Sequence, residues 1–254
     1  MNNHSTSETG HYKNLSSFQE LLLFIRILPK YNPARTALRT EGLQLQLDDA
    51  TNTMTLLDRA EAAESAAIKA RATPFTDLPS FATRVVAELE AAVPASTLLP
   101  AAKNILAKLY GKRIGKIRPG TQASGTAPKE GETQEAPRQI SVSQRSFDAT
   151  LDHFDKLTSI LEAEPEYATN HEELKVGALR AKYHQLHDLN SKANNAILQA
   201  NALRNERQLK LYAPVTGLVD TAKHVKKAVL SAYNANSPEY KKAASFSLRT
   251  LNKR

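Results

Sequence analysis

The sequence predicts an all-α fold, an elongated antiparallel helical bundle built from two pseudo-symmetric repeats. Aromatic residues make up only 6% of the chain, with no Trp, so the core must come from aliphatic side chains, which suits closely spaced helices. Apolar residues recur in steps of three and four along most of the chain, which is the period of an amphipathic helix. The two halves also share one order of helices and proline-containing breaks.

The composition restricts the class of protein. Of 254 residues, 41% are hydrophobic and 24% are charged, so the chain as a whole is not disordered by composition. Cysteine is absent, which excludes disulfides, thiolate metal sites, iron–sulfur clusters and cysteine nucleophiles. No run of about 18 apolar residues is present, and the stretch 21–28 is too short for a signal peptide. We therefore expect a soluble, cytoplasmic protein without a membrane span.

The first half begins with a polar segment, residues 1–13, that we expect to be disordered. Residues 14–28 then carry apolar side chains at helical spacing and predict an amphipathic helix. Asn32 followed by Pro33 is typical of a helix start, with an N-cap and a proline in the first turn. A long helix is predicted from there to residue 71.

Pro74 is expected to end this long helix. Thr76 is suited to cap a third helix that runs to about Ala92, and a fourth, shorter helix is predicted from Thr97 to Tyr110.

The composition changes in the middle of the chain. Residues 112–139 contain three of the twelve prolines and almost no large apolar side chains, and with Gly111 they contain five of the nine glycines. Such a segment cannot bury enough surface to offset its ordering entropy, so it is predicted to be a flexible linker. It separates a first helical repeat, 14–111, from a second, 140–254, and we expect both repeats to pack as one bundle.

The second half repeats the order of the first. An amphipathic helix is predicted over 146–161 and a long helix over 170–211. Pro214 is expected to stop the long helix, and Thr216 to cap the next one, which runs to about Tyr233.

The punctuation of the two halves matches in detail. Pro29-Lys-Tyr31 corresponds to Pro165-Glu-Tyr167, and Pro74-Phe-Thr-Asp-Leu78 corresponds to Pro214-Val-Thr-Gly-Leu218. Two ordinary helices that share a heptad by chance are the alternative, but the matching proline and threonine positions favour duplication. A shift of 140 positions aligns six apolar pairs: Phe75/Val215, Leu78/Leu218, Ala82/Ala222, Val85/Val225, Leu89/Val229 and Ala92/Ala232.

Four segments of the sequence resemble a known family. They are Leu78–Val85 (LPSFATRV), Ile140–Asp148 (ISVSQRSFD), Leu211–Ala222 (LYAPVTGLVDTA) and Ser237–Tyr240 (SPEY). They are similar to a family of uncharacterised, duplicated helical proteins of Bacteroidetes bacteria. The resemblance covers about residues 14–250 outside the linker. It implies a fold and a bacterial lineage, and it carries no activity, ligand or site residue to this chain.

The chain is basic, with a formal net charge of +8. Such a balance is typical of solvated helix faces and a basic tail, with contact to nucleic acid through phosphate groups as the less favoured alternative. No zinc-finger spacing, RNA-binding aromatic signature or helix-turn-helix pattern supports the second interpretation. The candidate anion or nucleic-acid contacts are Lys112, Arg113, Lys116, Lys223, Lys226, Lys227, Lys241 and Lys242.

Patterns that support catalysis are weak. His184 and His187 stand three residues apart beside Asp188, but a bundle metal site needs further inward carboxylates on paired helices. Glu172 and Glu173 are three turns away. Phosphate-binding glycine loops and nucleophile-elbow motifs are absent from the sequence. We therefore expect no metal, no cofactor and no enzymatic activity.

The function predicted from the sequence is that of a non-enzymatic structural or protein-interaction helical bundle. The alternative is a nucleic-acid-binding protein without sequence preference, using the basic clusters. The sequence identifies no partner, although it is compatible with a protein partner.

Overall fold

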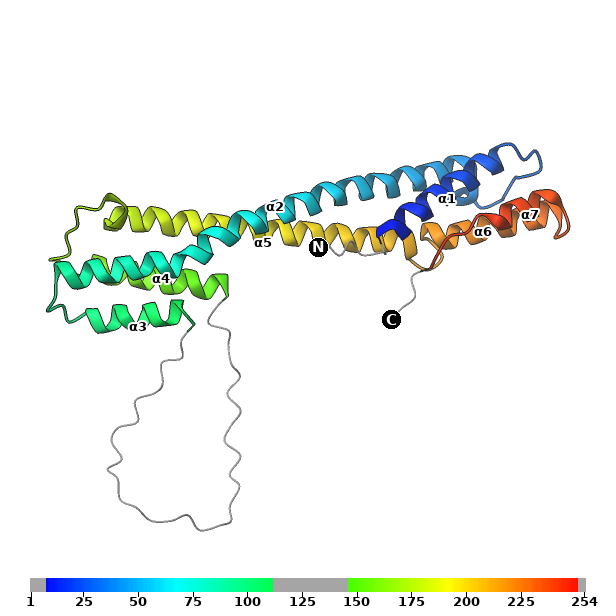
Figure 1. Ribbon diagram of the computed structural model, residues 1–254. Coiled ribbons are helices and arrows are strands. Elements are labelled where there is room, and N and C mark those ends of the chain that lie inside the picture. Colours follow the sequence, from blue (N-terminus) through cyan, green and yellow to red (C-terminus); the bar gives the residue numbers. More distant parts are fainter. Residues whose placement is uncertain (1–7, 112–145, 251–254) are drawn as a thin grey trace, which may run out of the picture. The chain divides into compact units, whose positions relative to one another are not determined.

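The computed structural model describes residues 8–111 and 146–250 (Figure 1). Within these ranges the chain forms α-helices, two short 3-10 helices and no strand, so the predicted all-α class is confirmed. The predicted linker, 112–139, and most of the predicted N-terminal tail lie outside the described residues.

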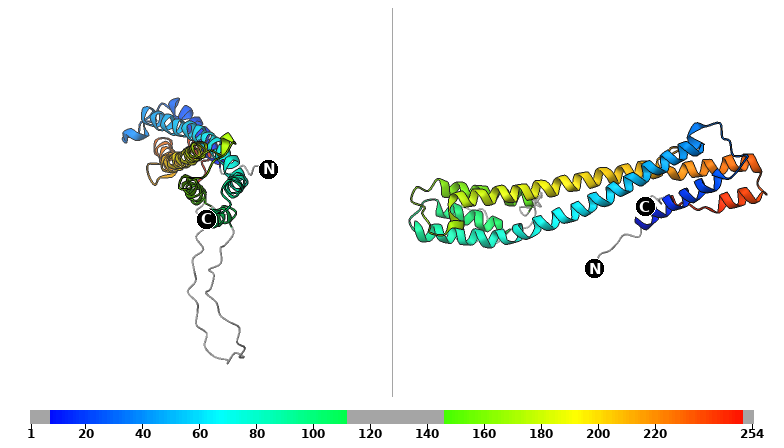
Figure 2. Two further views of the ribbon diagram at one scale, coloured as in Figure 1. Left: turned by 90° about the vertical axis from the view of Figure 1, so that its left-hand side faces the viewer. Right: turned by 90° about the horizontal axis from the view of Figure 1, so that it is seen from above.

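The described helices differ widely in length. Two are long, and the others are short helices that flank them in the chain (Figure 2). In chain order they are α1 (Glu8–Arg26), η1 (Thr36–Leu38), α2 (Thr40–Ala92), α3 (Leu99–Leu109), α4 (Phe147–Glu162), η2 (Glu172–Leu174), α5 (Val176–Tyr212), α6 (Leu218–Tyr233) and α7 (Pro238–Ser245).

The chain divides into two compact units. Unit 1 is formed by Met1–Ser65 together with Asn195–Arg254, and unit 2 is formed by Ala66–Asn194. The long helices α2 and α5 therefore contribute one part to each unit. Each unit combines segments from both predicted repeats, so the unit boundaries do not coincide with the repeat boundaries expected from the sequence.

Unit 1 has a core in which α1 packs against α6 and α7, with parts of α2 and α5. The apolar stripe of α1 is the one that the periodicity predicts, because Phe18, Leu22 and Ile25 are almost fully buried. Leu218, Ala222, Val225 and Val229 of α6, spaced by three and four residues, form the opposing stripe.

Unit 2 has a separate core made from α3, α4, the last part of α2 and the first part of α5. Val85 belongs to this core, whereas Val225 belongs to the core of unit 1, and both are completely buried. The alignment of the two repeats pairs these residues, and one shared bundle would bring them into one core; the structure assigns them to different cores.

Helix α2 does not end at Pro74, contrary to the prediction from the sequence. It continues through Pro74 and Pro79 to Ala92. A proline within a helix removes a backbone hydrogen bond and costs about 3 kcal/mol. Burial offsets this cost, because the side chains that follow, such as Leu78 and Val85, are completely removed from solvent.

Neither predicted threonine cap is present. The Thr76 hydroxyl donates to the carbonyl oxygen of Ala72 at 2.9 Å, which is a bond within a continuous helix. The second break, after α5, does occur. The N-cap of α6 there is Gly217 and not Thr216, and no side chain satisfies that cap.

The break between α5 and α6 is sharply turned. Val215 has a φ of 68°, a region that β-branched residues rarely adopt. The Thr216 N–H donates to the Pro214 carbonyl oxygen at 2.7 Å. A Cβ on Gly217 would lie 2.5 Å from the backbone nitrogen of Ala213, so the turn requires glycine at this position.

The beginnings of the first two helices also differ from the prediction. Helix α1 begins at Glu8 and not at Asn14. Asn32 and Pro33 lie in an irregular connection, and α2 begins at Thr40, after η1. By contrast, α3 and α4 begin and end within two residues of the predicted positions.

A tyrosine closes each of two similar loops. The Tyr31 hydroxyl donates to the Leu38 carbonyl oxygen at 2.7 Å, and the Tyr167 hydroxyl donates to the Leu174 carbonyl oxygen at 2.9 Å. Burial raises the pKa of both tyrosines to about 12. Each bond links the start of a loop to the 3-10 helix that precedes a long helix. The tyrosines of the matched Pro-x-Tyr sequences therefore have the same structural role in both loops.

Candidate functional site

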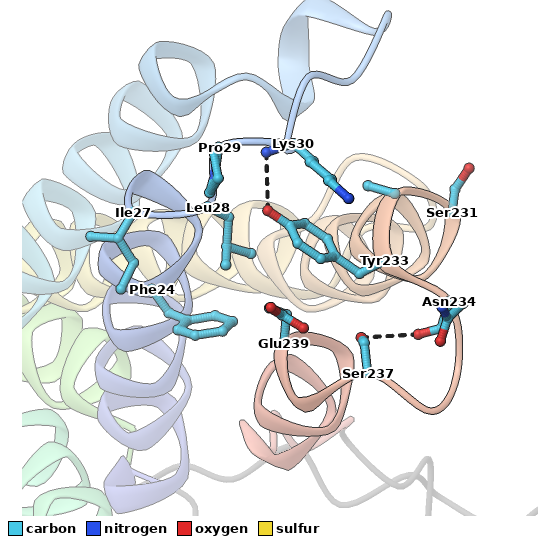
Figure 3. Close-up of a pocket in the computed structure, with 11 residues that line it drawn as sticks. Phe24, Ile27, Leu28, Pro29, Lys30, Ser231, Tyr233, Asn234, Ser237 and Glu239 are labelled. Carbon is cyan, nitrogen blue, oxygen red and sulfur yellow. Dashed lines mark hydrogen bonds between the residues drawn. The ribbon is translucent and has the colours of Figure 1, made fainter.

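A pocket of about 790 Å³ opens at one end of unit 1 (Figure 3). It lies where the end of α1, the end of α6 and the start of α7 meet. Its lining residues are Phe24, Ile27, Leu28, Pro29, Lys30, Ser231, Ala232, Tyr233, Asn234, Ser237 and Glu239.

The wall formed by α6 and α7 depends on a tight turn. Asn234 ends α6 with a φ of 66° and a ψ of 168°, a backbone conformation that is rare for any residue other than glycine. Its side-chain oxygen accepts from the Asn236 N–H at 3.1 Å. Ser237 caps α7 by accepting from the Tyr240 N–H at 3.0 Å, and it donates to the Asn234 carbonyl oxygen at 3.1 Å. This turn places Glu239 in the lining of the pocket, between Phe24 and Ser237 (Figure 3).

Tyr233 is the most constrained side chain of the pocket. Its hydroxyl accepts from the Lys30 backbone N–H at 3.0 Å, a bond that links the α1 loop to the end of α6 (Figure 3). The Lys30 ammonium lies 5.8 Å from the centroid of the Tyr233 ring. These contacts fix the position of the ring at one side of the pocket.

The opposite wall is apolar and belongs to α1 and the loop after it. Phe24 and Leu28 are half-buried, and Ile27 is 74% exposed. Leu23, one turn before Ile27, is 53% exposed. Leu23 and Ile27 thus form a small exposed apolar area that adjoins the pocket. The Phe24 ring packs against the ring of Phe246, with 5.8 Å between the ring centroids.

Charged groups surround the apolar wall. Besides Lys30 and Glu239, the Lys242 ammonium lies 5.1 Å from the centroid of the Phe246 ring, which itself packs on Phe24. Among the described residues, the lining of the pocket thus carries one ammonium group, that of Lys30, and one carboxylate, that of Glu239.

The structure describes five of the eight predicted basic contacts, and all five lie on the neighbouring helices α6 and α7 of unit 1. Lys227, Lys241 and Lys242 are exposed. Lys223 is also exposed and binds Asp220 through a 2.8 Å ion pair. Lys112, Arg113 and Lys116 lie outside the described residues.

Lys226 differs from the other predicted contacts because it has a structural role. Its ammonium donates to the carbonyl oxygens of Ala244, at 3.4 Å, and of Phe246. A cation at this position is favourable because the carbonyl groups at the end of α7 carry partial negative charge. Burial lowers the pKa of Lys226. This lysine ends α7 and is not a free contact for a phosphate group.

The histidines of α5 do not form a metal site. His184 and His187 are exposed, and the nearest carboxylate oxygen to His187 is that of Asp188, at 3.7 Å. Glu172 and Glu173 form ion pairs with a lysine and an arginine instead. Within the described ranges, no three histidine or acidic side chains are close enough to hold a metal ion.

A buried arginine, Arg71, was not anticipated from the sequence. Its side chain donates to the amide oxygens of Asn190, at 2.8 Å, and Asn194, at 3.0 Å. Its guanidinium lies 3.8 Å from the centroid of the Phe147 ring, and Asn190 also donates to Asp148 at 2.6 Å. Arg71 falls on the apolar stripe of α2, a position that could have signalled its burial. The packed helices of unit 2 enclose the Arg71 side chain and its hydrogen-bond partners, so these bonds fix the register of α2 against α5.

A second buried polar cluster fastens the C-terminal segment of unit 1. Asn14, which is 1% exposed, accepts from the Arg249 N–H at 2.8 Å and donates to the Arg249 carbonyl oxygen at 2.9 Å. It also donates to the Tyr212 hydroxyl at 3.1 Å, which contacts the His11 ring nitrogen at 2.7 Å. The extended segment after α7 is thus held on α1 by its backbone.

The comparisons with known proteins leave the function to be argued from this surface. No protein-family model matches the chain, and searches of curated proteins and of solved structures found no match. Of the helices described, none combines the length and apolar character needed to cross a membrane.

Proposed function

We propose that this chain is a non-enzymatic helical bundle that serves as a protein-interaction module, with the end of unit 1 as its contact surface. The observation that carries the proposal is the preformed pocket flanked by the exposed side chains of Leu23 and Ile27. Single exposed leucines are ordinary, whereas apolar side chains grouped around a pocket are typical of protein contacts.

The same proposal includes an internal duplication, and the local backbone supports it. The bond from the Tyr31 N–H to the Leu28 carbonyl oxygen is 3.1 Å long, and so is the bond from the Tyr167 N–H to the Glu164 carbonyl oxygen, 136 residues later. The tyrosine hydroxyl bonds to Leu38 and Leu174 recur with the same shift. We propose that one helical repeat was duplicated and that the two related repeats form an elongated bundle. We also propose that the chain is a cytoplasmic bacterial protein of the family that it resembles.

The proposal is tested by purifying the tagged full-length chain from cells that encode it, with and without nuclease. We expect a defined protein partner to be retained in both samples. Ile27→Ser should reduce its recovery. Leu45→Ser is the matched control, because Leu45 is 71% exposed on the same unit and does not line the pocket. A chain that retains no protein under either condition would contradict the proposal.

Nucleic-acid binding is a second candidate. It is favoured by four exposed lysines on the adjacent helices α6 and α7: Lys223, Lys227, Lys241 and Lys242. If these lysines contact phosphates, binding of a labelled single-stranded DNA should weaken steeply with salt. A variant with Gln at Lys227, Lys241 and Lys242 should show a smaller salt slope. Loss of every co-purified protein on nuclease treatment would favour this candidate over the first.

A further inference from the structure

We propose that unit 1 binds an extended peptide segment of a partner protein, and that the chain's own residues 246–250, here called the strap, occupy this site until a partner displaces them. The peptide that fits carries an aromatic and an aliphatic side chain two residues apart, as Phe246 and Leu248 do in the strap. This inference goes beyond the proposed function, because the strap residues do not line the pocket.

The strap follows α7 in an extended conformation. Phe246 has extended backbone angles, and residues 247–250 form neither helix nor strand. The side chains of the strap alternate, because Phe246 and Leu248 pack against the core of unit 1 whereas Ser247 and Arg249 are exposed. Extended peptides bound to protein surfaces alternate in the same way, since every second side chain faces the protein.

Side chains of unit 1 bind the backbone of the strap. Asn14, which is 1% exposed, accepts from the Arg249 N–H at 2.8 Å and donates to the Arg249 carbonyl oxygen at 2.9 Å. The Lys226 ammonium donates to the Phe246 carbonyl oxygen. These bonds involve no side chain of the strap, so a peptide of different sequence can form them, provided that it has no proline at the position of Arg249.

The Asn14 amide is also held by groups other than the strap. It donates to the Tyr212 hydroxyl at 3.1 Å, and this hydroxyl contacts a ring nitrogen of His11 at 2.7 Å. A polar group that its own neighbours hold in place loses little entropy when it binds a peptide. The Phe24 ring, 5.8 Å from the Phe246 ring between centroids, provides the contact for an aromatic side chain.

The residues that bind the strap backbone are specific to unit 1. In the proposed alignment of the two repeats, a shift of 136 positions places Thr150 at the position of Asn14, and a shift of 140 places Val86 at that of Lys226. Val86 is buried in the core of unit 2. The helices of unit 2 therefore pack without an amide or an ammonium group at these positions, so helix packing does not explain why unit 1 has them.

The strap can leave without the loss of a helix, because α7 ends at Ser245. Its advantage over a free peptide is its covalent attachment, which keeps its local concentration high. A partner segment has to overcome this advantage by binding more tightly. The affinity of the site for a peptide is therefore best measured in a variant with a weakened strap.

The first test titrates the full-length chain with a labelled peptide of residues 244–250 (ASFSLRT), followed by fluorescence anisotropy. The full-length variant Phe246→Ser/Leu248→Ser should bind the peptide. The wild-type chain should bind it about tenfold or more weakly, because its own strap competes. Leu248→Ser alone is the milder variant if circular dichroism shows that the double variant has lost helix content.

Two outcomes of this titration would contradict the proposal. One is a helical variant with a weakened strap that binds no peptide. The other is a loss of helix content in both variants, which would show that the strap is part of the core of unit 1 and not an exchangeable ligand.

The second test changes the peptide and leaves the protein unaltered. N-methylation of the Arg249 nitrogen removes the donor to Asn14 and should weaken binding about fivefold. N-methylation at Ser247 is the matched control, because this N–H makes no hydrogen bond among the described residues. A peptide with Ser in place of Phe246 and Leu248 should not bind. Equal affinity of the two methylated peptides would overturn the assignment of Asn14.

The third test identifies the partner chemistry by selecting displayed random heptapeptides on the variant with the weakened strap. We expect enrichment of peptides with an aromatic and an aliphatic residue two positions apart, and with varied residues between them. Enrichment of a different spacing, or of nothing, would show that the site does not accept a partner segment of this kind. Because these tests use synthetic peptides, their failure would leave the co-purification test of the pocket unaffected.

Discussion

The two units differ in the structure that forms at the matched Pro-x-Thr-x-Leu sequences. In unit 2, α2 runs through Pro74 and Pro79 without a break, whereas in unit 1 the corresponding proline, Pro214, lies in a sharp turn between α5 and α6. Pro74 is followed directly by Phe75, which the core buries, while Pro214 is followed by the exposed Val215 and by Thr216 and Gly217 before the buried Leu218. A proline alone therefore does not decide whether a helix ends. The residues after it decide whether burial offsets its cost or a turn replaces the helix.

The largest effect should come from Gly217→Ala. The added Cβ would meet the backbone of Ala213 at 2.5 Å, and backbone atoms cannot move aside as a side chain can. We expect the free energy of unfolding of unit 1 to fall by about 3 kcal/mol or more in urea titrations. Two controls separate this from a general effect of alanine. Gly177→Ala, in open space on α5, should stabilise slightly, and Thr216→Ala should be neutral because Thr216 caps nothing.

The continuity of α2 is tested by Pro74→Ala. If the helix is continuous, alanine restores a backbone hydrogen bond and removes a steric clash, so unit 2 should gain about 2 kcal/mol in the free energy of unfolding. Pro214→Ala, in the turn of unit 1, should change stability much less. An equal response of both units in chemical denaturation would show that α2 is broken at Pro74, as the sequence alone suggests.

The matched tyrosines should respond alike. Tyr31→Phe removes the hydroxyl that bonds to Leu38, and Tyr167→Phe removes the one that bonds to Leu174. Each variant leaves a backbone carbonyl oxygen without its hydrogen-bond donor. Each should therefore lower the free energy of unfolding, measured in thermal melts, by about 1 kcal/mol. A loss of stability confined to one variant would show that the two loops, despite their shared geometry, contribute differently to the stability of the protein.

The smallest effect should be a pH dependence specific to unit 2. His153 of α4 is 9% exposed, and both ring nitrogens lack a hydrogen-bond partner among the described residues. Burial, aided by Lys108, lowers the pKa of His153, while Asp152 opposes the shift. The unfolded chain then binds the proton more readily, so stability is full above about pH 6.5 and decreases as the pH falls below it.

Thermal melts at pH 7 and pH 5.5 measure this effect. His153→Leu should reduce the loss of stability between these two values. If the variant and the wild type lose stability equally, His153 is not the responsible group.

The sequence predicts the helices well where periodicity is strong. The apolar spacing in α1, α4 and α6 identifies their buried faces, and the ends of α3 and α4 follow from their flanking residues. Periodicity does not say which stripe contacts which. It therefore could not assign Val85 and Val225 to separate cores. That assignment depends on where long helices pass from one core to another.

The candidate site was not visible in the sequence for a different reason. The pocket is formed by residues about 200 positions apart, such as Leu28 and Tyr233, and by the positive φ of Asn234. The sequence analysis did single out four other lining residues, Pro29 and Lys30 in a Pro-x-Tyr sequence and Ser237 and Glu239 in the segment Ser237–Tyr240, but as marks of the fold and not of a site. The charge pattern predicted Lys242 as a phosphate contact, which stays a prediction, and Lys242 does not line the pocket. The charge pattern could not show that Lys226 is used inside the fold, because its acceptors are backbone carbonyl groups of α7.

The division of the chain into units has a consequence for how the protein emerges from the ribosome. Unit 2 is one uninterrupted stretch, so it can fold as soon as it is synthesised. Helix α1 must wait for α6, which follows about 190 residues later, and at roughly 5–20 residues per second this delay lasts on the order of ten to forty seconds. Throughout that interval α1 lacks the apolar side chains of α6 and α7 that cover it in the folded protein, so the nascent chain exposes apolar surface that favours aggregation.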